Sequence, residues 1–244
     1  MEYFKADYYG REMLEFEFLG RQAKLVLPET PAKGNPWLIK TEYFWAFSEF
    51  ERDMIDRGFA VAYIANKTRW HDPSDDSAKH EFSLFLQKEF GLNEKCLPVG
   101  MSCGGLQAVY FAAAYPTDIK GLYLDAPVLN LLSCPGGVGE GHSFMEEFTA
   151  HTGMTLTDLM SYRNHPLDNF VKLAENKLPV FLICGDSDKT VPYLENGKLL
   201  YDYYTERGLD IKQIIKENCD HHPHGLTDRT PLIEWALSLY GQSE

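Results

Sequence analysis

Short apolar segments alternate with amphipathic segments along most of the 244-residue chain, and this order restricts the fold more than any other feature. Apolar runs bounded by turn residues are typical of buried strands, and apolar residues three to four positions apart are typical of helices. Strands that alternate with helices predict an α/β fold, a mostly parallel sheet covered by helices on both faces. We expect strands at 36–40, 59–65, 96–100, 121–128, 179–185 and 211–216, and two shorter strands within 15–27.

Characteristic residues mark the ends of the helices between these strands. Ser48 and Glu51 form a capping-box pattern, which predicts that a helix begins there. Gly91 ends a helical stretch, because glycine readily adopts the left-handed conformation of a helix C-terminus. An Ala-rich helix is expected over 103–115, and Pro231 opens the last helix from a position that proline favours.

Residues 129–178 interrupt the alternation of strands and helices. They contain no convincing buried strand, and they begin with a Gly-rich loop followed by short helical pieces. A stretch of about fifty residues is too long for an ordinary connection. We expect a single domain over 1–244 with a small cap inserted at 129–178. The alternative is a long crossover connection with no role at a functional site.

The charge of the chain excludes some classes of partner. Its 36 acidic and 23 basic residues give a net charge of −13, which argues against nucleic acid and against an anionic membrane, because phosphate attracts basic surfaces. The N-terminal segment has no apolar signal-peptide core, and no apolar run reaches the ~18 residues of a membrane span, so we expect a cytoplasmic protein. The cysteines lack metal-ligand spacing, so we expect reduced thiols and no zinc; they are Cys96, Cys103, Cys134, Cys184 and Cys219.

The segment Gly100-Met101-Ser102-Cys103-Gly104 matches the G-x-S-x-G pattern of a nucleophile elbow. It follows a short apolar strand and opens a helix, as an elbow does. A serine on such a strained turn tolerates only small residues two positions away on either side. We expect Ser102 to be the nucleophile, with the backbone N–H of Cys103 and the helix N-terminus stabilising an oxyanion. The Cys103 thiol is an alternative nucleophile, but its position suits a buried structural thiol better.

A serine nucleophile needs a base to accept its proton and an acid to orient that base. In hydrolases with this elbow, the order along the chain is serine, acid, histidine. Asp186 and Asp188 both follow the expected strand at 179–185, at the sheet edge where catalytic groups gather. Asp188 is our choice for the acid. Asp186 is the closer alternative, and Asp125, after an earlier strand, is the more distant one.

Three histidines, His221, His222 and His224, lie in the loop after the last expected strand. We expect His221 to be the base and the other two to pack, cap the loop or line the pocket. A histidine cluster can bind zinc. No cysteine or carboxylate at metal-ligand spacing accompanies these three, so we expect no metal site.

These motifs give the chain a resemblance to the α/β-hydrolase superfamily over nearly its whole length. GMSCGG is similar to the family's elbow, GDSDKTVP is similar to its acid loop, and CDHHPHG stands where the family has a G-x-G-H base loop. The resemblance implies a catalytic triad of Ser102, Asp188 and His221. Cys219 and Asp220 replace the two glycines of the base loop, and this departure keeps His222 and His224 open as alternative bases.

The same resemblance implies a second oxyanion donor after the strand at 36–40. The family usually has an HG turn there, whereas this chain reads T-E-Y-F, so the implied donor is the backbone N–H of Thr41 or Glu42 beside that of Cys103. T-E-Y-F after this strand, together with HHPH in the base loop, resembles a subgroup of bacterial hydrolases. That resemblance implies carbohydrate esters as substrates.

The function expected from these residues is hydrolysis of a small-molecule carboxylic ester through an acyl-enzyme, with no cofactor. Lys40, Tyr43, Trp70 and His71 should follow carboxyl ends of strands and point toward the mouth of the site, so we expect them to bind substrate. Polar and aromatic side chains favour small polar or aromatic esters, such as carbohydrate-linked acetyl or hydroxycinnamoyl groups. The alternatives are a serine peptidase or amidase, and a non-catalytic binding protein with the same fold.

Overall fold

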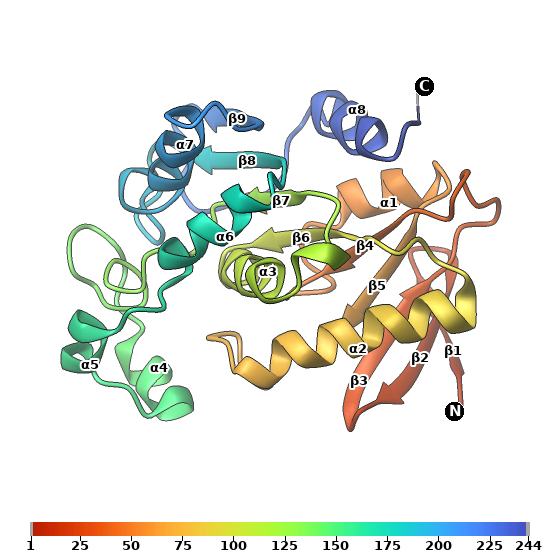
Figure 1. The fold of residues 1–244 in the computed structure, drawn as a ribbon, viewed down its shortest axis with the longest axis horizontal. Coiled ribbons are helices and arrows are strands. Elements are labelled where there is room, and N and C mark those ends of the chain that lie inside the picture. The colour runs from red at the N-terminus through yellow and green to blue at the C-terminus, as the bar shows by residue number, and fades with distance from the viewer. Residues whose placement is uncertain (1, 243–244) are drawn as a thin grey trace.

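The computed structural model describes residues 2–242, and a mixed sheet of nine strands runs through this part of the chain (Figure 1). The strands are β1 (Phe4–Tyr8), β2 (Arg11–Phe18), β3 (Arg21–Val26), β4 (Trp37–Lys40), β5 (Ala60–Ile64), β6 (Leu97–Met101), β7 (Leu122–Asp125), β8 (Val180–Gly185) and β9 (Ile211–Lys216). Their order in the sheet is β1-β2-β3-β5-β4-β6-β7-β8-β9. The pairings of β1, β2 and β3 are antiparallel, and all pairings from β5 to β9 are parallel. The α/β fold with a mostly parallel sheet is thus confirmed.

Helices cover both faces of the sheet and enclose two separate cores. The helices on one face are α1 (Glu49–Ile55) and α8 (Thr230–Leu239), and those on the other are α2 (Pro73–Phe90), α3 (Cys103–Ala114), α6 (Phe170–Glu175) and α7 (Gly197–Thr205). Successive residues of a strand point to opposite faces, so Leu38 packs in the core beneath α1 and α8 while Ile39 packs in the core beneath α2 and α3. No helix in the described range 2–242 is long and apolar enough to cross a membrane.

The capping box expected at Ser48 and Glu51 does not form. Ser48 is the N-cap of α1, but its side chain makes no capping hydrogen bond. The Glu51 carboxylate turns instead to the buried ammonium of Lys40, because that charge would otherwise lack an opposite charge inside the protein. A complete capping box lies at the start of α2, where Asp72 and Asp75 each accept from the other's backbone N–H.

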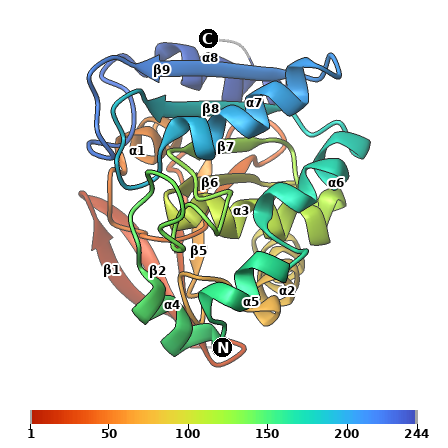
Figure 2. The same ribbon diagram turned by 90° about the vertical axis from the view of Figure 1, so that its left-hand side faces the viewer.

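The chain between β7 and β8 contains helices only: α4 (Met145–Thr152), α5 (Leu156–Ser161), the 3-10 turn η2 (Pro166–Asn169) and α6. Phe148 of α4 and Leu159 of α5 are buried against Trp70 and against Leu106 of α3. In Figure 1 the arrowheads of β6 and β8 point toward the side on which α4 and α5 lie, and Figure 2 shows that side from the front. This segment therefore lies beyond the carboxyl ends of the central strands.

Candidate active site

Ser102 lies at the sharp turn between β6 and α3, with a φ of 53° and a ψ of −120°. Positive φ is uncommon for a residue with a side chain and marks a strained turn. A Cβ on Gly100 would lie 2.6 Å from the carbonyl oxygen of Gly104. A Cβ on Gly105 would lie 2.3 Å from the Cβ of Pro127. The turn therefore depends on glycine at both positions, and its geometry is that of a nucleophile elbow.

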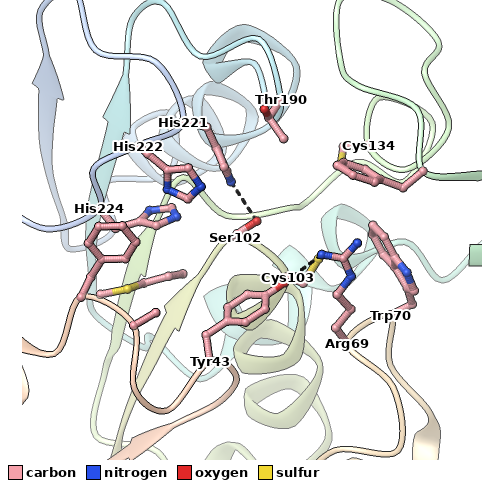
Figure 3. A pocket seen from close by; sticks show the side chains of 14 residues that line it. Tyr43, Arg69, Trp70, Ser102, Cys103, Cys134, Thr190, His221, His222 and His224 are labelled. Atoms are coloured by element: carbon pink, nitrogen blue, oxygen red, sulfur yellow. Dashed lines mark hydrogen bonds between the residues drawn. The ribbon is translucent and has the colours of Figure 1, made fainter. Parts of the chain in front are cut away.

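Two hydrogen bonds join Ser102, His221 and Asp188, and Figure 3 shows the one between Ser102 and His221. The distance from Ser102 Oγ to His221 Nε2 is 3.0 Å, and the distance from His221 Nδ1 to Asp188 Oδ2 is 2.8 Å. Since a carboxylate only accepts hydrogen bonds, Nδ1 carries the imidazole proton and Nε2 offers its lone pair to the serine hydroxyl. Asp188 and His221 are both buried, which strengthens the electrostatic interaction between them.

The alternative acids lie elsewhere. Asp186 is exposed, and its carboxylate accepts a hydrogen bond from the neighbouring Ser187 hydroxyl. Asp125, at the end of β7, is buried and pairs with a different histidine: His224 Nδ1 lies 2.8 Å from Asp125 Oδ1. The backbone N–H of Gly225 donates to the other oxygen of Asp125 at 2.6 Å. The site thus contains two histidine–carboxylate pairs, of which only the one with Asp188 extends to Ser102.

The second pair was not foreseen in the sequence, because its members stand 99 positions apart. In the sequence pattern, Asp125 is an alternative acid and His224 an alternative base. Their pairing ties the base loop to the end of β7, next to the elbow. The remaining histidine of the loop, His222, is exposed and stacks on Phe47 with ring centroids 5.5 Å apart.

Of Thr41 and Glu42, the two alternatives expected for the second oxyanion donor, Thr41 has its backbone N–H already bonded. Its backbone N–H donates to the carbonyl oxygen of Val99, and its hydroxyl donates to the carbonyl oxygen of Gly104. The backbone N–H groups of Glu42 and Cys103 have no acceptor within the described range of residues. Cys103 is the first residue of α3, where helix geometry leaves the N–H free.

The thiol of Cys103, the alternative nucleophile, is buried. Burial raises the pKa of this thiol to about 11, which disfavours the reactive thiolate.

A cavity of about 370 Å³ opens beside Ser102. Tyr43 and Trp70, two of the side chains expected to bind substrate, line it. Lys40 does not line it: its ammonium is buried at the carboxyl end of β4, bonded to Glu51 and to the backbone of Ala46. The residues that line the cavity are Tyr43, Ala46, Phe47, Arg69, Trp70, Met101, Ser102, Cys103, Cys134, Phe144, Thr190, His221, His222 and His224.

His71 was also expected to bind substrate and does not line this cavity. Its Nε2 lies 2.8 Å from a carboxylate oxygen of Asp76, and its ring stacks on Tyr110 with centroids 3.9 Å apart. His71 lines a separate, smaller pocket, and Trp70 lines both pockets. The neighbouring Asp72 caps α2.

Arg69 is a cavity residue that sequence reasoning missed. Its Nη1 donates to the Tyr43 hydroxyl at 3.3 Å, and its Nε donates to a Glu147 carboxylate oxygen at 2.7 Å. The guanidinium carbon lies 4.8 Å from the centroid of the Trp70 ring, within the range of a cation–π interaction. Burial raises the pKa of Tyr43 above its ordinary range, so this hydroxyl stays protonated and can donate to a bound molecule. The wall opposite the histidines is therefore aromatic with one cation.

No protein-family model matches the chain. Solved structures match it over nearly its full length. Dipeptidyl peptidase 4 of Porphyromonas gingivalis is 15% identical with a TM-score of 0.66, and the match covers 99% of this chain and 35% of that one. A puromycin hydrolase is 15% identical with a TM-score of 0.70, covering 99% and 39%. Acylaminoacyl peptidase of Pyrococcus horikoshii is 17% identical with a TM-score of 0.65, covering 90% and 37%.

These likenesses show that the chain has the α/β-hydrolase fold. Identities of 15–17% establish the fold alone. The chain spans little more than a third of the length of these proteins.

Proposed function

We propose that the chain is a serine hydrolase in which Ser102 is the nucleophile, His221 the general base and Asp188 the acid that orients the base. The observation that carries the proposal is the continuous hydrogen-bond chain from Ser102 Oγ through His221 to Asp188, with lengths of 3.0 and 2.8 Å. The same alignment argues against the non-catalytic alternative, since a binding protein has no need of a proton acceptor on a strained serine.

In the proposed reaction, Ser102 Oγ attacks a carbonyl carbon while His221 Nε2 accepts the hydroxyl proton. The oxyanion that forms binds the free N–H groups of Cys103 and Glu42, and each such donor is typically worth about 3–4 kcal/mol. His221 then gives its proton to the leaving group, and an acyl-enzyme remains on Ser102. Water repeats the sequence, with His221 again as the base, and releases the acid.

For the bond that is cleaved, we favour the peptidase or amidase alternative over the esterase. Two of the structural neighbours are peptidases and the third is a puromycin hydrolase. Ester hydrolysis uses the same residues and has a better leaving group, so small esters are expected to serve as substrates too. A cavity of about 370 Å³ is at the small end of the range for ligand pockets, which suits one side chain or a small acyl group.

The segment 129–178 is proposed to act as a cap over this cavity. Phe144 lines the cavity, and Glu147 of α4 accepts hydrogen bonds from both Arg69 and the Trp70 indole N–H. These contacts connect the cap to the aromatic wall. An aromatic acyl group, such as a phenylalanyl or hydroxycinnamoyl group, could stack on Trp70 and Phe144 while its polar end meets Arg69.

A matched pair of substrates tests the proposal and separates its two forms. N-acetyl-phenylalanine p-nitroanilide and N-acetyl-phenylalanine p-nitrophenyl ester share the acyl group and differ in the bond. We expect the chain to hydrolyse both. The corresponding N-acetyl-alanine substrates should have a lower kcat/KM, because the alanine side chain is too small to pack against the aromatic wall of the cavity. Hydrolysis of the ester alone would favour the esterase. Hydrolysis of neither, or equal rates in a Ser102→Ala variant, would refute a serine hydrolase.

A further inference from the structure

The rings of His221, His222 and His224 form a compact cluster beside Ser102 (Figure 3). Their centroids are 4.9 Å apart in each of the three pairs. One ring nitrogen from each histidine lies within 4.8 Å of the other two, and all three rings line the cavity. Only the His221 ring is needed for the proposed triad. The other two add ligand atoms at the position where the proton transfer takes place.

Carboxylates orient two of these rings in the same way. Asp188 accepts from Nδ1 of His221, and Asp125 accepts from Nδ1 of His224, each at 2.8 Å. Both histidines therefore have their proton on Nδ1 and a free lone pair on Nε2. Histidines that bind metal ions are commonly held in this manner, by a carboxylate that fixes the tautomer and makes the coordinating nitrogen more basic.

His222 differs from the other two because neither of its ring nitrogens has a hydrogen-bond partner within residues 2–242. Its ring is held by stacking on Phe47, and it is the exposed member of the cluster. Tetrahedral coordination with bonds of about 2.0–2.1 Å places ligand nitrogens about 3.4 Å apart. The ring nitrogens must therefore approach one another by up to about 1.4 Å, and the exposed His222, without hydrogen bonds to its ring, can make most of that movement.

We propose that His221, His222 and His224 form a zinc-binding site, and that a bound Zn²⁺ reversibly blocks the hydrolase. Imidazole nitrogen is a preferred zinc ligand, and three histidines leave the fourth position open toward the cavity for water. The site overlaps the triad because the ion takes the same Nε2 lone pair that accepts the Ser102 proton. This inhibitory consequence rests on the proposed function, whereas the binding does not.

In the sequence, no cysteine or carboxylate stands at metal-ligand spacing from these histidines, so the sequence alone predicts no metal site. The structure supplies carboxylates of another kind, Asp188 and Asp125, which support the ligands without touching the ion. The same loop carries the thiol of Cys219, whose sulfur contacts backbone oxygens of Asp220 and His222. It lies outside the three-nitrogen cluster.

Calorimetric titration of the Ser102→Ala chain with Zn²⁺ tests the binding without any dependence on hydrolysis. We expect one saturable site. His222→Ala should weaken it at least 10-fold, and Asp125→Asn should weaken it about 10- to 100-fold through the loss of the carboxylate behind His224. His151→Ala, which removes an exposed histidine of α4 outside the cluster, is the matched control and should leave the affinity unchanged. The absence of a saturable site, or unchanged affinity in His222→Ala, would overturn the proposal.

A second measurement tests whether the bound Zn²⁺ occupies His221. Zn²⁺ should inhibit hydrolysis of the p-nitrophenyl ester by the unmodified chain at the concentration at which it binds, and EDTA should restore the rate. Binding without inhibition would show that the ion does not occupy His221 and would overturn the proposed position. A chain that binds Zn²⁺ at this cluster but hydrolyses no substrate would contradict the proposed function and leave the metal site standing.

Discussion

Replacement of Asp188 by asparagine tests how the acid holds the base. Asp188 Oδ1 accepts from the backbone N–H groups of Thr190 and Val191, each at 2.8 Å, and Oδ2 accepts from His221 Nδ1. An asparagine must turn its carbonyl oxygen toward the two backbone N–H groups, because its NH2 group cannot accept a hydrogen bond from them. Its NH2 group then donates to Nδ1 of His221, and the imidazole proton moves to Nε2.

A proton on Nε2 leaves His221 with no lone pair for the hydroxyl proton of Ser102. In serine-protease triads this change of tautomer lowers kcat by about 10⁴-fold, which corresponds to about 5.5 kcal/mol. We expect a loss of that size in kcat with little change in KM, measured with the p-nitrophenyl ester, and an unchanged thermal unfolding midpoint. Asp186→Asn is the matched control and should keep its rate, since that carboxylate is exposed. Retention of more than about a tenth of kcat in Asp188→Asn would refute the assignment of the acid.

Two further substitutions test the surroundings of the triad, and a third tests a buried charge on α2. Asp125→Asn should lower the free energy of unfolding by about 1 kcal/mol, because hydrogen bonds from His224 and Gly225 to a charged carboxylate are stronger than those to a neutral amide. Urea unfolding measures this, and an unchanged free energy of unfolding would refute a stabilising role of the Asp125–His224 pair. Gly105→Ala should destabilise the chain by about 3 kcal/mol or more through the clash with Pro127, and a soluble, fully active variant would contradict the elbow geometry. Burial lowers the pKa of Lys79 to about 8, so between pH 8 and its unfolded pKa of 10.5 the unfolded chain binds the extra proton. The stability of the chain relative to Lys79→Met should therefore rise by up to about 1.4 kcal/mol per pH unit across that window, and a flat or falling difference would show that the ammonium is solvated.

The central strands and the elbow could be predicted because their constraints are local in the sequence. A strand buried on both faces needs a continuous apolar run, and the elbow needs its glycines at fixed positions around Ser102. The edge strand β1 was missed, since most of its side chains are exposed and it carries no apolar run. The capping box at Ser48 was wrong because the buried charge of Lys40 takes the Glu51 carboxylate that the local pattern assigns to the helix start.

The direction of each side chain at the mouth could not be predicted, because it depends on contacts between distant segments. Lys40 is the last residue of β4, and its side chain turns inward to Glu51. Arg69, which no motif marks, turns into the cavity toward Glu147 of α4. The pairing of Asp125 with His224 likewise forms only when β7 and the base loop meet. Local patterns thus located the catalytic candidates, and tertiary contacts decided what surrounds them.

Labelling with a fluorophosphonate, followed by intact mass and peptide mapping, tests the central claim most directly. Such a reagent reacts with a serine only where a base removes its proton and an oxyanion hole holds the product. We expect one adduct per chain on Ser102, complete loss of labelling in Ser102→Ala, and strong slowing in His221→Ala. Labelling that persists in Ser102→Ala, or an unmodified chain that does not react, would contradict the account of this site as a serine hydrolase.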